Sequence, residues 1–295
     1  MSAVARARRV AYAVGVLLLV VAVWELVKAF VPERGVSIGD QRILPRTNDG
    51  ALPHVWSVIT VLGDKDGSGT VGGTLVRTAG FTFGLALLAL AIGTVVGIAL
   101  AVVMQRFSFV ERGLLPYIIV SQTVPLIALA PLVAGWGGKI VIAGEPWRPW
   151  MSIAVIASYL AFFPVAVGML RGLQAPSKAS VELLYSYSAS WWETLLHLRF
   201  PAAVPHFLPA LRLAAAASVI GAVVAEISTG TAGGIGRQII VFSQQATGDA
   251  ARLYAAVLVA ALLGVAVTAV VGFAEFALRR YSRPVGARSS SGGTR

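Results

Sequence analysis

Long apolar runs recur along this chain, and they constrain its fold more than any other feature. A run of about 20 such residues is long enough to cross the hydrocarbon core of a bilayer as a helix. The runs are continuous rather than alternating, which favours helices as the spanning form. We therefore predict an all-α membrane protein with six transmembrane helices, at residues 10–30, 78–104, 114–136, 150–172, 203–227 and 251–278.

Composition supports this class and excludes others. The 295 residues are 57% hydrophobic and 13% charged, which is more apolar surface than a soluble domain of this size can bury. Without cysteine there can be no disulfide, thiol nucleophile or cysteine-bound metal. His54, His197 and His206 are not at metal-ligand spacing, so we predict no metal site. The net charge is +11, and the basic residues mostly flank the apolar runs, as membrane orientation requires. We therefore expect lipid and not nucleic acid as the partner.

The charge distribution also predicts an orientation. Residues 1–9 form a basic tail, residues 10–278 the transmembrane domain, and residues 279–295 a flexible tail. No small-residue cleavage site closely follows the first run, so we interpret it as an uncleaved span. The side that holds both termini carries 13 Lys and Arg, against 10 on the other side, where the long 28–77 loop weighs less. Both termini are therefore predicted to be cytoplasmic.

Residues 176–201 interrupt the apolar pattern with an amphipathic segment. Ser177 is placed to cap a first short helix. The sequence Ser188-Ala189-Ser190 then breaks that helix, and Ser190 with Glu193 predicts a capping box for a second one. The apolar faces are Val181, Leu184 and Tyr185 on the first helix and Trp191, Leu195 and Leu198 on the second.

Two interpretations of this helical pair are open from the residues alone. It is either a rigid dock for a cytoplasmic partner, which would meet the acidic Glu182, or an amphipathic anchor with Trp191 and Trp192 at headgroup depth.

The segment resembles the EAA loop of ABC-importer permeases: E-A-A, three residues, Gly, about nine residues, an aliphatic, one residue and Pro. The matching positions here are Glu182, Leu183 and Leu184 for E-A-A, Ser188 for Gly, Leu198 for the aliphatic and Pro201 for Pro; Ala189, Ser190 and Trp192 match the local A-S-x-W form. The two leucines imply a bulkier fit in the partner's cleft. Ser188 replaces a glycine that permits a left-handed turn, so we expect a strained or differently shaped turn.

Three further stretches resemble the nitrate/sulfonate/taurine-type permeases. They are SQTVPLIALAPLVAGWGG (121–138), AFFPVAVGMLRGL (161–173) and VVAEISTGTAGGIGRQI (223–239). The resemblance covers residues 74–278 in the right order.

The resemblance implies the fold of a type I ABC importer permease in a bacterial plasma (inner) membrane. Such a chain is not an enzyme and holds no cofactor, because ATP and Mg²⁺ bind a separate cytoplasmic ABC ATPase. That ATPase would dock at residues 178–200, where Glu182 would pair with a basic residue, and Trp192 and Leu198 would hold the second helix against the spans. Other implied partners are an extracellular, periplasmic or lipid-anchored solute-binding protein and a second copy of this chain.

The family imports small solutes. The string SQTVPLIALAPL resembles the importers of nitrogen heterocycles, such as pyrimidine thiamine precursors or riboflavin-like compounds. The alternative is a small anion: sulfonate, taurine, nitrate or bicarbonate. Rival classes are a secondary transporter, a membrane enzyme and a scaffold protein, but no convincing repeat, mid-span acid or catalytic constellation supports them.

Polar or aromatic positions in the spans are candidates for the passage or its gate. They are Ser121, Gln122, Thr123, Pro125, Tyr159, Phe163 and Glu226. The alternative for the polar ones is hydrogen bonding between helices, and for the aromatic ones core packing. Glu226 is either a gate or a helix-end contact.

Other positions have mainly structural expectations. Arg212 lies inside the fifth span and is either functional or paired within the bundle. Glu275 and Arg279 have the spacing of a helical pair, and Glu25 and Lys28 are expected to snorkel at the outer interface. The pairs Gly80/Gly84 and Gly93/Gly97 predict close helix contacts, within the chain or across a dimer seam.

Overall fold

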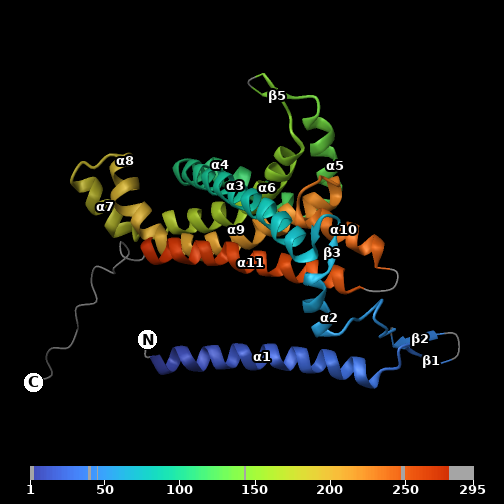
Figure 1. Ribbon diagram of the computed structural model, residues 1–295. Coiled ribbons are helices and arrows are strands. Elements are labelled where there is room, and N and C mark those ends of the chain that lie inside the picture. The colour runs from blue at the N-terminus through green and yellow to red at the C-terminus, as the bar shows by residue number, and fades with distance from the viewer. Residues whose placement is uncertain (1–2, 39–40, 45, 143, 247–249, 279–295) are drawn as a thin grey trace, which may run out of the picture. The chain divides into compact units, whose positions relative to one another are not determined.

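The computed structural model describes residues 3–38, 41–44, 46–142, 144–246 and 250–278. It divides into two compact units, made of residues 1–80 with 233–261 and of residues 81–232 with 262–295. Figure 1 shows that long helices dominate both units. The helices α3 (Val71–Arg106) and α11 (Ala251–Leu278) contribute residues to both.

The first unit holds shorter elements besides one long helix. Its own elements are α1 (Ala3–Phe30), β1 (Val36–Ile38), β2 (Gln41–Leu44), α2 (Val55–Thr60), the 3₁₀ helix η1 (Val61–Gly63), β3 (Lys65–Asp66), β4 (Gly69–Thr70) and α10 (Ile235–Gln245). β1 pairs antiparallel with β2, and β3 with β4. Gly67 has a φ of 59° in the β3–β4 turn, a conformation that glycine adopts without strain.

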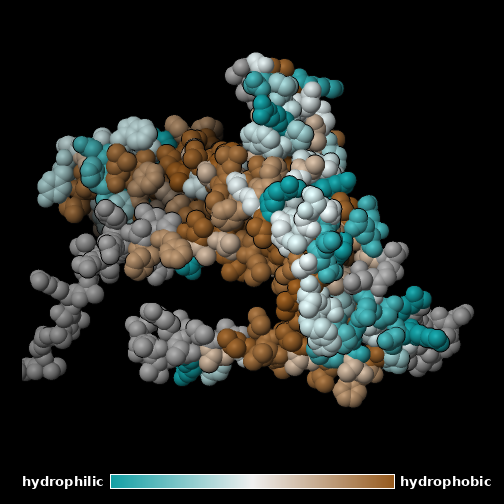
Figure 2. Space-filling view, viewed as in Figure 1, coloured by the Kyte–Doolittle hydropathy of each residue, from teal (hydrophilic) through white to brown (hydrophobic). Residues whose placement is uncertain are grey.

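The second unit contains the packed bundle. Its own elements are α4 (Ser108–Ser121), α5 (Leu126–Gly137), the paired strands β5 (Val141–Ile142) and β6 (Glu145–Pro146), α6 (Pro149–Leu173), α7 (Lys178–Ser186), α8 (Trp191–Thr194), the π-helix η2 (Leu195–Arg199) and α9 (Phe200–Thr229). Figure 2 shows apolar residues over the long helices and hydrophilic residues around α7 and α8.

Four predicted spans are confirmed as helices that are long and apolar enough to cross a membrane. The predicted spans 78–104, 150–172, 203–227 and 251–278 lie in α3, α6, α9 and α11. Their many exposed apolar side chains are those expected of helices that face lipid.

The N-terminal prediction is confirmed only as a helix. Residues 10–30 lie in α1, and that this helix crosses the membrane stays a prediction. The helix already begins at Ala3, so most of the predicted tail 1–9 is helical. The predicted tail 279–295 lies outside the described residues.

The third predicted span is wrong as a single helix. Residues 114–136 are divided between α4 and α5, whose axes are bent by 102° at a short break. Pro125 is the N-cap of α5 and has no backbone N–H, and its ring disfavours helical backbone at the preceding residue. The polar sequence Ser121-Gln122-Thr123 therefore lies at the end of a half-helix rather than on the side of a continuous one.

The helices α6 and α9 approach each other at the level of the main chain. A Cβ atom at Gly172 would lie 2.7 Å from Ala203 Cα, and one at Gly221 would lie 2.8 Å from Ala157 Cα. No other residue fits these positions without a shift, because real Cβ atoms do not approach so closely. The small residues Gly172 and Gly221 therefore allow the two main chains to pack within the bundle.

The two predicted glycine pairs on α3 differ. Gly93 and Gly97 pack against α6, where an added Cβ at either would lie 2.8 Å from an α6 side chain, which confirms close packing within the chain. Around Gly80 and Gly84, no described atom lies within 4 Å of the Cβ position. A seam between copies at that pair stays a prediction.

Candidate functional site

The first helix of the interrupting segment is capped at both ends by its own residues. The Ser177 side chain accepts a hydrogen bond of 3.2 Å from the Ser180 N–H, as predicted for an N-cap. At the other end Ala189 N–H bonds to Leu184 O at 3.0 Å, and Ser188 N–H bonds to Tyr185 O at 2.9 Å. This pair of bonds is a Schellman motif, which satisfies the last carbonyls of α7.

Ser188 occupies the left-handed position of that motif. Its φ is 59°, the only positive φ of a non-glycine residue in the described part of the chain. The turn therefore keeps the left-handed conformation that glycine supplies in the EAA pattern, and serine bears the steric penalty of about 1 kcal/mol. The expectation of a strained turn is confirmed, and the expectation of a different shape is not.

The second helix begins with the predicted capping box. The backbone N–H of Ser190 donates to Glu193 Oε2 at 2.6 Å, and the backbone N–H of Glu193 donates to Ser190 Oγ at 3.3 Å. Together with the Schellman motif, this box fixes both sides of the break without help from the rest of the bundle. We call residues 178–200 the α7–α8 hairpin.

The hairpin presents a mixed surface outward. No residue of α7 is buried, and Glu182, Leu183 and Tyr185 are all exposed. Leu184, the second leucine of the E-A-A position, is half-buried together with Val181 on the inner stripe. An acidic group and exposed large apolar side chains are therefore displayed together.

The base of the hairpin is rooted in the bundle. Leu195 is buried in a core cluster with Met104, Ile118 and Leu173, and Trp191 packs against that cluster. The Arg106 guanidinium lies 5.0 Å from the centroid of the Trp191 ring, within the range of a cation–π contact.

The role expected of Trp192 in the second helix needs correction. Trp192 does not hold the helix against the spans, because its side chain is largely exposed, and Trp191 makes that contact instead. Leu198 is half-buried, and that it holds the helix against the spans stays a prediction. Helical periodicity places adjacent residues about 100° apart, so only one tryptophan of the pair can face inward.

The second helix is also not a separate element. α8 continues through η2 into α9, so one helix runs from Trp191 to Thr229. The π-turn, in which Phe200 N–H bonds to Leu195 O, comes directly before Pro201, which has no N–H to donate. Pro201 therefore sits in the first turn of α9.

The passage candidates meet at the α4–α5 break. The Tyr159 hydroxyl of α6 donates to Ser121 O, one of the carbonyls at the end of α4. The side-chain hydroxyls of Ser121 and Thr123 bond to Ile118 O and Val120 O of the helix itself. Gln122 Nε2 is buried with no hydrogen-bond partner in the described part of the chain, and Pro125 is exposed.

The other two candidates pack between helices. Phe163 lies against the core cluster at the hairpin base, which favours core packing for it. Glu226 is fully buried, and the Thr82 hydroxyl of α3 donates to its Oε1 at 2.8 Å. This contact joins α3 to α9 and favours the helix contact over the gate.

Arg212 pairs within the bundle. Its Nη2 donates to Glu275 Oε2 on α11, which confirms the structural alternative. The expected partner of Glu275 was Arg279, which lies outside the described residues. The helical-pair rule considers only neighbours on one helix, so it did not find a partner on α9.

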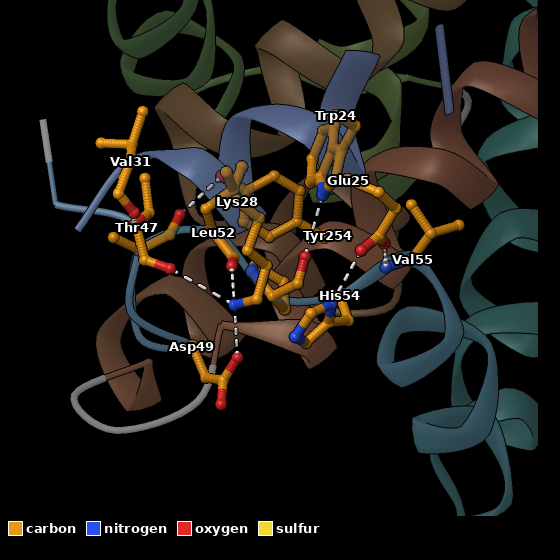
Figure 3. Close-up of polar contacts among 12 residues, drawn as sticks. Trp24, Glu25, Lys28, Val31, Thr47, Asp49, Leu52, His54, Val55 and Tyr254 are labelled. Carbon is orange, nitrogen blue, oxygen red and sulfur yellow. Dashed lines mark hydrogen bonds and ion pairs between the residues drawn. The ribbon is translucent and has the colours of Figure 1, made fainter. Parts of the chain in front are cut away.

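A second polar cluster was not predicted, and Figure 3 shows it. Residues 47–55, which we call the strap, are fastened to one face of α1. Lys28 Nζ donates to Asp49 Oδ1 and to Leu52 O, both at 2.6 Å, and Trp24 Nε1 donates to Pro53 O at 3.0 Å. Lys28 and Glu25 therefore do not snorkel as expected.

The remaining strap contacts extend this fastening. Glu25 accepts hydrogen bonds of 2.8 Å from Val55 N–H and from His54 Nδ1, and the Tyr254 hydroxyl of α11 donates to Ala51 O at 2.8 Å. The Lys28 hydrogen bond lowers the pKa of Asp49 below its usual value. The spacing of Trp24, Glu25 and Lys28 on one helix face was the only signal in the sequence.

A family model described as the binding-protein-dependent transport system inner membrane component matches residues 93–281. The chain belongs to this family. The resemblance to ABC-importer permeases is thereby confirmed, and the matched range contains the α4–α5 break, the α7–α8 hairpin and the Arg212–Glu275 pair of this permease.

Individual relatives agree. The formylaminopyrimidine transport permease protein ThiX of Halalkalibacterium halodurans is 35% identical over 49% of this chain, a match that spans 54%, about half, of that relative. A probable ABC transporter permease protein of Haemophilus influenzae is 30% identical over 65% of this chain and 79% of its own. A crystal structure of an amino acid ABC transporter with histidines has a TM-score of 0.53 at 20% identity and covers 70% of this chain and 95% of its own. This last likeness shows the permease fold alone.

Proposed function

We propose that this permease forms the passage of an ATP-driven importer, in which a separate cytoplasmic ABC ATPase docks on the α7–α8 hairpin. The observation that carries the proposal is the construction of the hairpin. Its caps are internal, its outer face displays Glu182 and Leu183, and its base is packed into the core cluster through Leu195. A rigid body with an exposed face and a buried root can pass a push from a partner to the spans.

The hairpin transmits motion through its root. Leu195 shares a core cluster with Met104 of α3, Ile118 of α4 and Leu173 of α6, and Trp191 packs against that cluster, so a displacement of the hairpin would move these helices together. In the proposed cycle two ATPases close on ATP and Mg²⁺, two hairpins are drawn together and the passage opens away from the cytoplasm. This cycle requires two permease subunits, and we propose a homodimer with both termini of each copy in the cytoplasm.

The docking residues have distinct roles in this proposal. Glu182 pairs with a basic residue of the ATPase, and Leu183 fills an apolar cleft beside it. Leu184, Ala189 and Ser190 keep the shape of the hairpin. The left-handed Ser188 sets the direction in which the chain turns from α7 into α8. Leu198 and Pro201 join it to α9.

The passage would run beside the α4–α5 break. Pro125 frees backbone groups there, and the Gln122 amide offers N–H donors, while Tyr159 holds the end of α4. A solute delivered by an extracytoplasmic binding protein, periplasmic or lipid-anchored, would pass these groups.

A small nitrogen heterocycle, such as a pyrimidine thiamine precursor or a riboflavin-like compound, is the proposed solute. The ThiX relative supports this class through its named substrate, formylaminopyrimidine. The candidate passage positions also carry no cation that would select an anion. A small anion such as a sulfonate, taurine, nitrate or bicarbonate is the alternative, and transport without an ATPase would indicate a secondary transporter.

Co-purification tests the docking proposal. The tagged permease is solubilised gently, and its partners are identified by mass spectrometry for wild type, Glu182→Lys and the matched control Glu145→Lys. We expect an ABC ATPase with wild type and with the control, and its loss with Glu182→Lys at an unchanged melting temperature. An ATPase that stays bound and coupled in Glu182→Lys would remove Glu182 from the contact, and an ATPase absent from wild type would refute the docking role.

A further inference from the structure

An apolar pocket lies beside the strap in the first unit, and nothing in the proposed import function uses it. Its volume is about 320 Å³. It is lined by three helices: α1 contributes Trp24, α2 contributes Val55, Val58 and Ile59, and α11 contributes the rest. The lining side chains offer almost no polar surface to an occupant.

The walls follow from helical periodicity. On α11 the pocket residues Tyr254, Val257, Leu258 and Ala261 have the spacing i, i+3, i+4, i+7 of a single helix face. The three α2 residues have the matching spacing i, i+3, i+4. Two apolar stripes thus face one space that no described side chain of the unit fills.

Two aromatic residues form the end of the pocket next to the strap. The rings of Trp24 and Tyr254 meet edge to face, with centroids 5.3 Å apart. Trp24 Nε1 donates to Pro53 O and the Tyr254 hydroxyl to Ala51 O, so both polar groups reach the strap (Figure 3). The two rings line the pocket. Trp and Tyr with a polar end toward backbone and an apolar body toward hydrocarbon are typical of the membrane–water interface.

The pocket is partly open to its surroundings. Ile59, Val257 and Leu258 line it and yet keep about half of their surface exposed. In a helix that crosses a bilayer, such exposed branched side chains lie among lipid chains. The pocket therefore opens from the surface of α11, one of the helices that are long and apolar enough to cross a membrane.

We propose that this pocket binds one acyl chain of a membrane lipid. Three observations select this occupant: the lining is apolar, the pocket opens beside a span, and the interfacial Trp24–Tyr254 pair closes its end. A polar solute would lose its hydrogen bonds to water and gain none in return. Lys28, a buried cation on the same helix as Trp24, is already bonded to Asp49 and to two strap carbonyls, so the headgroup contributes little to the binding.

Fluorescence quenching by lipid tests this site. The full chain is placed in vesicles of phosphatidylcholine with brominated acyl chains, and the Trp24 signal is the difference between wild type and Trp24→Phe. Ala261→Phe fills the pocket from within, and Ala266→Phe makes the same change at another exposed position of α11 outside the pocket.

We expect brominated chains to quench Trp24 in wild type and in Ala266→Phe, and Ala261→Phe to remove about half or more of that quenching because a filled pocket excludes its ligand. Native mass spectrometry should show one retained lipid fewer in Ala261→Phe alone. Anionic phosphatidylglycerol vesicles should give the same result as phosphatidylcholine.

Equal quenching in Ala261→Phe and Ala266→Phe, with equal retained lipid, would overturn the proposal. Absent quenching in wild type would also overturn it and would indicate that protein covers the pocket, from this chain or a second copy. Neither outcome depends on an ATPase, so this proposal and the docking proposal fail independently.

Discussion

Two ion pairs of this permease each join one buried and one exposed side chain, but the buried member is the acid in one pair and the base in the other. In the bundle, the acid Glu275 is 3% exposed and its partner Arg212 is 54% exposed. At the strap, the base Lys28 is 8% exposed and its partner Asp49 is 66% exposed. The buried member decides what each pair contributes, because a charge that loses its partner inside the protein keeps its desolvation penalty.

The two buried members differ in their other contacts. Lys28 also donates to Leu52 O and Thr47 O, so it keeps two acceptors without Asp49. Glu275 Oε1 has no hydrogen-bond partner in the described part of the chain, so Glu275 depends on Arg212. The bundle pair should therefore be the more sensitive to loss of its exposed partner.

The largest effect is expected for Arg212→Ala, which leaves the buried Glu275 carboxylate without a cation. We expect a loss of about 3 kcal/mol in the free energy of unfolding, measured by thermal or denaturant unfolding in detergent. Arg212→Ala combined with Glu275→Gln should recover most of this loss, because the amide carries no charge. If the double variant were as unstable as Arg212→Ala, the pairing would not be the cause.

A smaller effect is expected for Lys28→Met, which keeps the length of the side chain but removes three hydrogen bonds to the strap. Loss of these bonds should destabilise the strap by about 2 kcal/mol. Limited proteolysis should then cleave within residues 47–55 faster than in wild type, while cleavage in the α7–α8 hairpin stays unchanged. Equal protection of the strap would show that Trp24, Glu25 and Tyr254 hold it without Lys28.

The smallest effect is expected for Asp49→Asn, because Asp49 is largely exposed and Lys28 keeps its carbonyl acceptors. The loss should stay below about 1 kcal/mol. A loss as large as that of Lys28→Met would contradict the difference drawn between buried and exposed members.

The same pair predicts a weak dependence on pH. The Lys28 hydrogen bond lowers the pKa of Asp49, so the ionised form stabilises the fold above the unfolded-state pKa, and this contribution is lost as the pH falls through the lowered pKa. Strap protection should therefore decline in acid and stay constant from neutral to mildly alkaline pH. Asp49→Asn should remove this acid-dependent part.

Much of the fold could be predicted because it follows from local chemistry. The apolar run 251–278 coincides with α11, and the caps at Ser177 and Ser190 lie where hydrogen-bonding side chains precede amphipathic turns. The α4–α5 break was missed although Pro125 was recognised, because a proline inside an apolar run is compatible with a kink or with a full break.

The long-range contacts could not be predicted in the same way. Arg212 and Glu275 are separated by 63 residues, and Lys28 and Asp49 by 21, so no helical spacing relates them. Periodicity indicates which side of a helix is apolar but not which helix lies opposite. Periodicity did place Trp191 and Leu195 on the apolar face of the second helix, and only the role that the resemblance implied for Trp192 was wrong.

The glycine contacts between α6 and α9 have a mechanical consequence. Where backbone touches backbone, as at Gly172 and Gly221, no side chain can change rotamer to absorb a displacement. The two helices therefore move as one stiff lever. α9 has 30 residues and is about 45 Å long, so a tilt of about 5° at its hairpin end would carry its far end by about 4 Å. A small tilt of α9 at one membrane face thus becomes a displacement of about 4 Å at the other.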